Sequence, residues 1–562
     1  MGQGAAVSGA RGDGGRGPTR RQLLGAALAA PLAACTRDDA ARWQGGWVGA
    51  DDARGHLVRD GWPESKSGAP PPIARSRRVG ALVVGAGVAG LAAARALIAG
   101  GVEDCHVLEL EDRAGGNSRG HAIAGMRCPL GAHYLPVPGA AALEVAALLD
   151  ELGARRVEHG RAVYDERMLC HTPEERLFVG GGWRAGLLPP IEALPAGERA
   201  TTLAQYRAFA AAVASAGEGD AFAIPTARSR WNAALAALDR FTFADWLDRQ
   251  GLVAPALRWY LDYCCRDDYG AGSADVSAWA GLHYFASRHG FRAPDDDARG
   301  ESEGEGGGVL TWPEGNAWLT ERLAAPLGDR LHAGRIALAV DEGRDEVAVD
   351  AWNAASGARE RWIARRVVVA TPLFVTARLV AAPADALRKA ARILRHAPWL
   401  VANLQLSAAL DDRPGAPPSW DNVVYGGAGL GYVDAMHQST RPYAGPTVLT
   451  AYRALGSSDA AALARERTRL LADDWRQWTA KIVAELAPAH PDLAGKLVRA
   501  DLMRYGHAMS IPAPGVRSSA ALAALAAPQR RVQFAHADLS AYSVFEEAFF
   551  HGTRAGRAAA AQ

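Results

Sequence analysis

Three glycines and one acidic residue have the types and spacing of a dinucleotide site. Gly85, Gly87 and Gly90 follow the apolar run VGALVV and open an alanine-rich stretch. Such glycines permit a tight turn, approach of the backbone to a pyrophosphate, and close packing of a helix on a strand. Glu109 ends a second apolar run nineteen residues after Gly90, where a carboxylate can bind ribose hydroxyls. We therefore expect a nucleotide here, with its pyrophosphate at the helix N-terminus, rather than a glycine-rich turn without a ligand.

Two further motifs narrow the choice of nucleotide. VLELEDRAGGNSRG continues beyond Glu109, and VQFAHADLSAYSVFEEAFFHGTRAG closes the chain over 532–556. They resemble the second fingerprint and the closing motif of FAD enzymes of the glutathione-reductase-like superfamily, particularly its flavin amine oxidase and phytoene desaturase branch. The resemblance implies FAD as cofactor and Asp538 at its ribityl and pyrophosphate portion, with Ala537 replacing the usual Gly. Arg113, Gly115, Gly116 and Asn117 are the further cofactor-binding candidates that it implies.

Oxidation of an amine by a flavin needs little acid or base chemistry from the protein, because flavin N5 accepts the hydride. The protein must orient the C–H bond, keep the amine neutral and exclude water. Members of this branch commonly place a Lys near N5, but the matching segment, HAPWLVANLQL, contains none. Reaction with oxygen is therefore in doubt, and dehydrogenase chemistry stays open. Trp399 or Asn403 either takes the place of the Lys or is an ordinary strand residue.

Four residues are candidates for the catalytic cavity. Tyr505 and His507 in RYGHAMSIPAPG lie where the chain reaches the flavin cavity in similar proteins. The imidazole either binds substrate or acts as a base, or it is a hydrogen-bonded structural histidine. Tyr542 is expected either in the wall facing the flavin or in the core. Trp312 lies in a loop that resembles the re-entry into the FAD domain, beside Glu314, which either holds an ammonium group or caps the next helix.

A pair of acids in the middle of the chain bears on the substrate. Asp267, Asp268 and Tyr269 lie in CCRDDYGAGSADVSAWAGLHYF. Paired acids either bind a polycation or face solvent at the end of a helix. The segment weakly resembles the substrate domain of bacterial spermidine dehydrogenases. This resemblance makes a small-molecule amine, and polyamines in particular, the expected substrate.

The elements that must position these residues come from distant parts of the chain. The patterns predict an α/β fold: a Rossmann FAD-binding domain of glutathione-reductase-like type, built from discontinuous segments, and an α+β substrate domain. We expect FAD-binding segments at 78–155, 305–375 and 529–562, and substrate-domain segments at 156–304, mostly helical, and 376–528. Helices are expected over 201–214 and 243–263, strands over 105–110, 335–350, 363–371 and 530–534, and a loop over 294–308.

Composition excludes several classes of protein. The chain has 62 basic and 61 acidic residues and a net charge of +1, which gives no reason to expect nucleic acid as a partner. The cysteines show no CxxC spacing, so neither a disulfide scaffold nor a zinc site is expected, and no other metal site is. Adjacent Cys264 and Cys265 are either a strained redox pair or two small buried residues.

The N-terminus has the pattern of an export signal. Arg20 and Arg21 precede an apolar stretch in TRRQLLGAALAAPLAAC, the layout of a twin-arginine signal over 1–35, followed by a linker over 36–77. The stretch is shorter than the ~20 residues of a membrane-spanning helix. LAAC resembles a lipoprotein processing box, so membrane association is expected only through a lipid on Cys35, or the cysteine is incidental to an ordinary cleavage site.

The sequence thus predicts a periplasmic FAD-dependent oxidoreductase that oxidises an amine by hydride transfer to flavin N5. Export in the folded state fits a cofactor that is loaded in the cytoplasm. Two other functions stay open: a desaturase or isomerase of a lipidic substrate, and a flavin-bearing protein that binds a partner or relays electrons. The sequence predicts neither the electron acceptor nor the oligomeric state.

Overall fold

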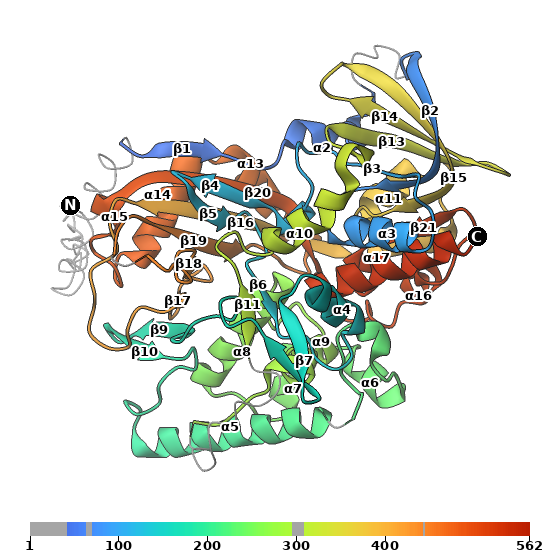
Figure 1. The fold of residues 1–562 in the computed structure, drawn as a ribbon. Coiled ribbons are helices and arrows are strands. Elements are labelled where there is room, and N and C mark those ends of the chain that lie inside the picture. The colour runs from blue at the N-terminus through green and yellow to red at the C-terminus, as the bar shows by residue number, and fades with distance from the viewer. Residues whose placement is uncertain (1–41, 63–69, 218, 295–307, 442–443) are drawn as a thin grey trace, which may run out of the picture.

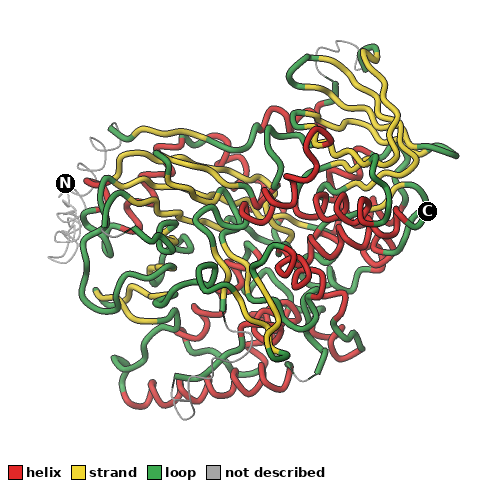
Figure 2. Tube along the Cα trace, in the orientation of Figure 1, coloured by secondary structure: helices red, strands yellow, loops and turns green. Residues whose placement is uncertain are grey.

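A computed structural model of the chain describes residues 42–62, 70–217, 219–294, 308–441 and 444–562. Its strands gather in two large sheets, one of seven strands and one of eight, with helices between and below them (Figures 1 and 2). The fold confirms the predicted class, an α/β part built from discontinuous segments joined to an α+β part. The predicted signal and the cysteine proposed to carry a lipid lie outside the described residues.

The seven-stranded sheet contains the predicted nucleotide-binding strand. β2 lies between β3 and β15, and all three run parallel, as do β12 and β21 at their sides. β14 and β13 extend the sheet as an antiparallel pair. The strands are β2 (Ile73–Val84), β3 (Cys105–Leu108), β12 (Leu331–His332), β13 (Arg335–Glu342), β14 (Val347–Asn353), β15 (Ala358–Val369) and β21 (Val532–Phe534).

Two helices from opposite ends of the chain pack together beside this sheet. α3 (Val88–Ala99) follows the glycine turn, and α17 (Phe545–Ala560) ends the chain next to it (Figure 1). A Cβ at Gly552 would lie 2.1 Å from the carbonyl oxygen of Ala89, and one at Gly556 would lie 2.4 Å from that of Ala93. Glycines on α17 and alanines on α3 therefore permit a contact that larger residues would block.

The eight-stranded sheet carries the second part of the molecule. β16 and β20 are long antiparallel neighbours near one side, and their register places Trp399 opposite Tyr505. The strands, in sheet order, are β1 (Gln44–Trp47), β20 (Leu497–Ile511), β16 (Arg395–Leu406), β19 (Thr447–Ala454), β18 (Tyr432–Asp434), β17 (Asp421–Val424), β9 (Glu175–Val179) and β10 (Gly182–Ala185). Shorter strands pair beside the sheets: β4 (Gly120–Ile123) with β5 (Met126–Pro129), β6 (Tyr134–Pro136) with β11 (Val309–Thr311), and β7 (Arg155–Glu158) with β8 (Arg161–Tyr164).

A group of helices packs below the second sheet in the view of Figure 1. They are α5 (Ala196–Ala216), α6 (Ala233–Leu238), α7 (Phe243–Arg249), α8 (Pro255–Tyr269) and α9 (Ala278–Tyr284). The remaining α-helices are α2 (Asp52–Asp60), α4 (Leu143–Glu151), α10 (Ala317–Ala324), α11 (Leu373–Leu379), α12 (Asp385–Ile393), α13 (Ala460–Ala472), α14 (Trp475–Leu486), α15 (Leu493–Lys496) and α16 (Ala520–Ala526). No helix among the described residues is long and apolar enough to cross a membrane.

Three local expectations need correction. The stretch expected as a linker over 36–77 contains α2, the start of β2, and β1, which pairs with β20. The helix expected over 243–263 is two helices, because Gly251 adopts a left-handed φ of 69° and Pro255 starts a new helix. The strand expected over 335–350 is the hairpin β13–β14, which turns at Gly343.

Candidate functional site

A cavity of about 340 Å³ lies where β2, α3 and β3 meet. Gly85 and Gly87 line it from the turn between β2 and α3, and Glu109 lines it from the end of β3. The cavity thus lies at the carboxyl ends of parallel strands, the edge at which open α/β sheets bind nucleotides. Gly115, Gly116 and Asn117, three of the further cofactor-binding candidates, line it as well.

The glycines fit a bound dinucleotide for three separate reasons. Gly85 has a φ of 99°, which side chains rarely adopt. A Cβ on Gly90 would lie 1.8 Å from the carbonyl oxygen of Gly85, so this glycine brings α3 onto the strand. A Cβ on Gly87 would meet only the Cα of Gly116, at 3.8 Å, so it would project into the cavity itself. The backbone is open where a pyrophosphate must approach it.

Glu109 lies at the place predicted for a ribose acceptor. Its Oε2 accepts a hydrogen bond from the N–H of Ala86 at 2.8 Å, and its Oε1 accepts one from the N–H of Glu111 at 2.9 Å. Burial raises the pKa of Glu109, while these backbone donors and Arg119 oppose the rise. The carboxylate is therefore fixed in position at the cavity wall and has lone pairs left for hydroxyl donors.

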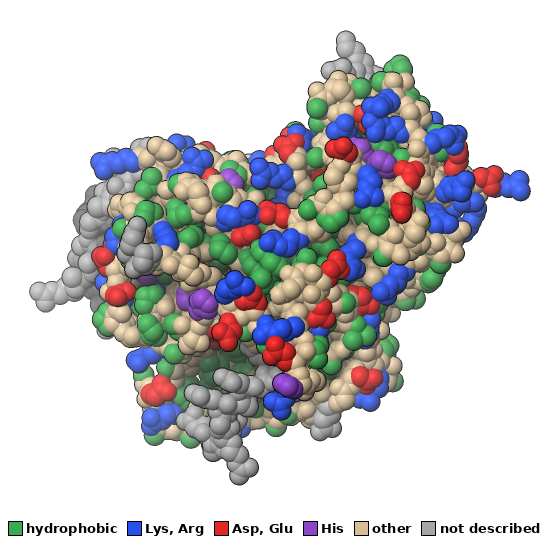
Figure 3. All heavy atoms as spheres, in the orientation of Figure 1, with side chains coloured by type: hydrophobic (Ala, Val, Ile, Leu, Met, Phe, Trp, Pro, Cys, Tyr) green, Lys and Arg blue, Asp and Glu red, His purple; other side chains and the backbone are tan. Residues whose placement is uncertain are grey.

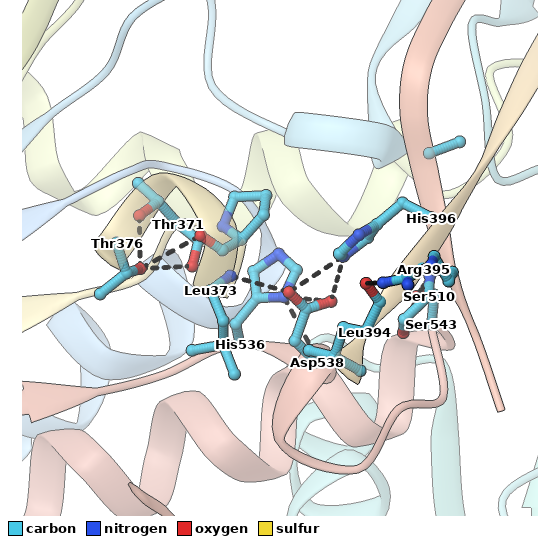
Figure 4. A network of polar contacts seen from close by, with 12 residues as sticks. Thr371, Leu373, Thr376, Leu394, Arg395, His396, Ser510, His536, Asp538 and Ser543 are labelled. Atoms are coloured by element: carbon cyan, nitrogen blue, oxygen red, sulfur yellow. Dashed lines mark hydrogen bonds and ion pairs between the residues drawn. The ribbon is translucent and has the colours of Figure 1, made fainter. Parts of the chain in front are cut away.

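Asp538 has a different environment from the one that the resemblance implies. Its Oδ2 accepts the N–H of Leu373 at 2.8 Å, and its carboxylate lies 3.0 Å from Nε2 of His396 and 3.2 Å from Nδ1 of His536 (Figure 4). Burial by itself raises the pKa of Asp538, but the two histidines outweigh it and hold the pKa well below its usual value. The carboxylate does not line the cavity, whereas its neighbours His536 and Ala537 do.

Two other candidates lie away from their expected positions. Arg113 is exposed and is absent from the cavity wall. His507 lines the nucleotide cavity rather than the place where a substrate would bind, with its ring 4.6 Å from that of Phe374. A role of His507 as the substrate's base does not fit this position.

A second, smaller cavity of about 130 Å³ adjoins the first. Six residues line both cavities: Asn117, Ala132, Ala508, Ser543, Val544 and Phe545. Val544 and Phe545 form the N-terminus of α17, so the start of this helix lies at the junction. The wall of the smaller cavity is aromatic, with Tyr134, Trp399, Tyr452 and Tyr505. The Tyr505 hydroxyl donates to the carbonyl oxygen of Leu130 at 2.9 Å, which fixes the ring.

Charged side chains form one end of this smaller cavity. Asp267, Asp268, Glu546 and Arg288 line it. Arg288 donates to Glu546 at 3.0 Å and to Asp268 at 3.3 Å, and the Tyr542 hydroxyl donates to Asp268. Burial raises the pKa values of Asp268 and Glu546, and the charge of Arg288 opposes both rises. The carboxylates of Asp268 and Glu546 are thus both paired with the guanidinium of Arg288.

Asp267 differs from its neighbour because it has no hydrogen bond or ion pair among the described residues, although it lines the cavity. Burial, followed by the negative charge of Asp268, raises the pKa of Asp267 to about 7. Three carboxylates and one guanidinium give the cavity a formal charge of −2 when all are ionised. An aromatic cavity with this excess of negative charge suits a cation with an apolar body.

Figure 3 shows a hollow with hydrophobic walls in the lower half of the molecule, with acidic and basic side chains around it.

The remaining sequence candidates lie outside the two cavities. Tyr542 is buried behind Asp268, and Trp312 stacks on Trp318 at 4.7 Å. Glu314 forms an ion pair with Arg127 at 3.4 Å. Tyr269 and Asn403 are buried and hydrogen-bonded to backbone carbonyls.

Sequence reasoning missed several cavity residues. Tyr134 lies on the short strand β6 and Tyr452 on the longer strand β19, and no motif surrounds either residue. Arg288 follows α9 in a single π-helical turn, and only the fold brings it to Glu546, which is 258 positions away. Glu546 was detectable, because it is an acid in the first turn of the closing helix.

None of the described cysteines lines either of the two cavities. Cys264 and Cys265 are buried and free, so they form no disulfide in this structure. No cluster of three or more histidine, cysteine, aspartate or glutamate residues is arranged to hold a metal within the ranges that the structure describes.

Comparisons with known proteins identify a family and a shared fold. The family model described as flavin containing amine oxidoreductase matches residues 88–560. Putrescine oxidase bound to putrescine is 18% identical, with a TM-score of 0.59 over 86% of this chain and 99% of that chain. Cyclohexylamine oxidase from Brevibacterium oxydans is 17% identical, with a TM-score of 0.58 over 86% and 98%. A fatty acid isomerase from P. acnes is 15% identical, with a TM-score of 0.55 over 84% and 97%. No curated protein sequence matches the chain.

Proposed function

This chain belongs to the family of flavin-containing amine oxidoreductases, and we propose that it oxidises a polyamine or another slender amine with more than one positive charge. FAD is the cofactor that the family implies, and the larger cavity fits it. When bound, FAD supplies the hydride acceptor, N5. The chain itself must bind the amine, orient it and exclude water.

One observation carries the proposal: the cavity that adjoins the cofactor cavity has three carboxylates and a single guanidinium. Asp268 and Glu546 are paired with Arg288, which leaves Asp267 to bind a substrate ammonium group. The aromatic side chains of Trp399, Tyr452 and Tyr505 then enclose the alkyl part of the amine. Putrescine, which is bound in one protein of the same fold, is a diamine of this kind.

Asp267 is also suited to accept the proton that must leave the substrate. An alkyl ammonium group has a pKa of about 10, like that of lysine, and must be neutral before hydride transfer. A carboxylate whose pKa is about 7 is a better base than an ordinary aspartate. We infer that a carboxylate oxygen of Asp267 binds the ammonium group and takes its proton.

The alternative of a lipidic substrate fits the cavity less well, although a fatty acid isomerase shares the fold. A volume of about 130 Å³ is small beside the ~300–1,000 Å³ of pockets for drug-sized ligands. A fatty carboxylate would also meet three acids there. Spectral titration of the oxidised holoenzyme with putrescine, spermidine and linoleate tests this choice. We expect the diamine and triamine to perturb the flavin spectrum, and tighter binding of linoleate would reject the proposal.

Binding of the amine is expected to depend on pH through Asp267. The carboxyl is protonated below its pKa of about 7 and then no longer attracts the substrate cation. The dissociation constant of the amine should therefore rise by about tenfold for each pH unit below 7, and level off above it. Measured values of the dissociation constant between pH 5 and 8 test this dependence. A flat profile for the wild type would exclude Asp267 as the titrating group.

We further propose that the chain is exported folded through the twin-arginine route and anchored by a lipid on Cys35. The motif TRRQLLGAALAAPLAAC supports export, and a cofactor that is loaded before export fits this route. Replacing Arg20 and Arg21 by lysine should leave the protein in the cytoplasm, as measured by cell fractionation. Replacing Cys35 by alanine should release the exported protein from the membrane fraction. If the wild type, the double lysine variant and the Cys35→Ala variant were distributed equally among the cell fractions, both proposals would be contradicted.

A further inference from the structure

A third cavity, of about 470 Å³, lies at the edge of the eight-stranded sheet. None of its lining residues lines the cofactor cavity or the substrate cavity. Its buried wall includes Arg176 on β9, Trp183 on β10, Asn422 on β17, Tyr432 on β18, and His490 shortly before α15. The site is therefore separate from the site proposed for amine oxidation.

Arg176 is buried with neutral partners only. It is 5% exposed, and the register of β9 and β17 places it opposite Asn422, whose Oδ1 accepts from Nε at 2.5 Å. Nη1 donates to the carbonyl oxygen of Ala416 at 3.2 Å, and the guanidinium lies 4.0 Å from the centre of the Trp183 ring. Among the described residues no carboxylate lies within ion-pair distance of it, whereas buried Arg288 has two.

Burying a guanidinium without an ion-pair partner is unfavourable for the free energy of folding. Arginine stays protonated in proteins, so it cannot escape the cost by losing its proton. Burial lowers the pKa of Arg176, and the opposing effects of Tyr432 and Asp412 do not cancel it. The neighbouring cavity offers room for the missing counter-charge.

Two further polar groups of this wall lack a hydrogen-bond partner within the part of the chain that the structure describes. The Tyr432 hydroxyl lies 2.7 Å from Nε2 of His490, and in the tautomer in which the hydroxyl donates, the imidazole proton is on Nδ1. Nδ1 of His490 and Nε1 of Trp183 are both buried without a hydrogen-bond partner among the described residues. Burial and the charge of Arg176 lower the pKa of His490 to about 4, so the ring is neutral at pH 7.

Charges at the mouth of the cavity are mixed. Arg413 and Arg441 line it, as do Asp411, Asp412 and Asp434. Asp411 is paired with Lys496 at 2.6 Å, and Asp434 accepts from Thr447 at 2.7 Å. Two of the three acids thus have partners of their own.

We propose that this third cavity is a binding site for a small oxyanion, a carboxylate or a phosphate group, which pairs with Arg176. The planar guanidinium matches the oxygens of such a group. The larger body of a ligand that carries the oxyanion would occupy the outer part of the cavity, near Arg413 and Arg441.

Calorimetric titration of the holoenzyme with inorganic phosphate, acetate and citrate at constant ionic strength tests the proposal. We expect at least one of them to bind with a dissociation constant below about 1 mM. Arg176→Gln should weaken that binding by at least about tenfold. Arg184→Gln, an exposed residue on the neighbouring strand β10 that does not line the cavity, should leave it unchanged.

Arg176→Gln removes a buried side chain, so a second variant keeps the test independent of folding. Arg413 is exposed at the mouth of the cavity, and Arg413→Gln should weaken binding by about two- to fivefold. The dissociation constants of phosphate, acetate and citrate, compared with one another, identify which oxyanion the site prefers. No binding by the wild type, or binding that neither Arg176→Gln nor Arg413→Gln weakens, would overturn the proposal.

Discussion

Replacing Asp267 by asparagine is expected to slow reduction of the bound flavin by a polyamine by about 100-fold at low substrate concentration. Removing one partner of a buried charge pair costs about 2–5 kcal/mol, and each 1.4 kcal/mol is a factor of ten. Asp268 and Glu546 cannot replace Asp267, because Arg288 already holds both. Stopped-flow absorbance under anaerobic conditions measures the rate against substrate concentration. The variant should also lose the pH dependence of amine binding.

Asp262→Asn is the matched control, because Asp262 lies on the same helix, α8, outside the cavity. Its Oδ1 accepts from the backbone N–H and the hydroxyl of Ser273, and an amide oxygen keeps both bonds. This variant should reduce its flavin at the wild-type rate. Equal rates for Asp267→Asn and the wild type would remove Asp267 from the substrate site.

Replacing Gly87 by valine is expected to abolish FAD binding while leaving the fold intact. The new Cβ would meet only the Cα of Gly116, at 3.8 Å, and the backbone at Gly87 has a φ of −72° that valine accepts. The side chain would instead occupy the space that the pyrophosphate needs. We expect the affinity for FAD to fall by at least about 100-fold. The ratio of flavin absorbance to protein, and titration of the apoprotein with FAD, measure this loss.

Gly90→Ala separates packing from cofactor binding. Its Cβ would lie 1.8 Å from the carbonyl oxygen of Gly85, so α3 would have to move away from β2. Overpacking of this kind costs about 1–3 kcal/mol, and the melting temperature of the apoprotein should fall. Gly87→Val should leave that temperature unchanged. If Gly87→Val retained FAD at the wild-type ratio, the glycine turn would not be the pyrophosphate site.

The sequence predicted best those parts of the site that lie close together in the chain. The glycines 85, 87 and 90 and the acid Glu109 belong to one β–α–β unit, whose geometry follows from local pattern. The sequence showed Asp267 as one of two adjacent acids. It did not predict that the two would differ in their hydrogen bonds and ion pairs. Only the fold shows that both acids line the cavity and that Arg288 pairs with Asp268.

Long-range contacts account for most of what the sequence did not predict. Trp399 and Tyr505 face each other because β16 and β20 pair in one register, which no local pattern encodes. The Gly-rich stretch QGGW was read as part of a linker, although it forms β1 against β20. Tertiary pairing there overrides a weak strand propensity. The contacts of Asp538 with His396 and His536 were likewise beyond a reading of motifs.

Anaerobic mixing of the FAD-loaded protein with putrescine or spermidine tests the central claim most directly. The visible absorbance of the flavin reports its reduction without any assumption about the electron acceptor. We predict that at least one of these polyamines bleaches the flavin, and that readmitted air or an added acceptor restores the colour. A flavin that stays oxidised with both polyamines, but that cyclohexylamine bleaches, would contradict the polyamine assignment. A flavin that no amine bleaches would contradict amine oxidation at this site.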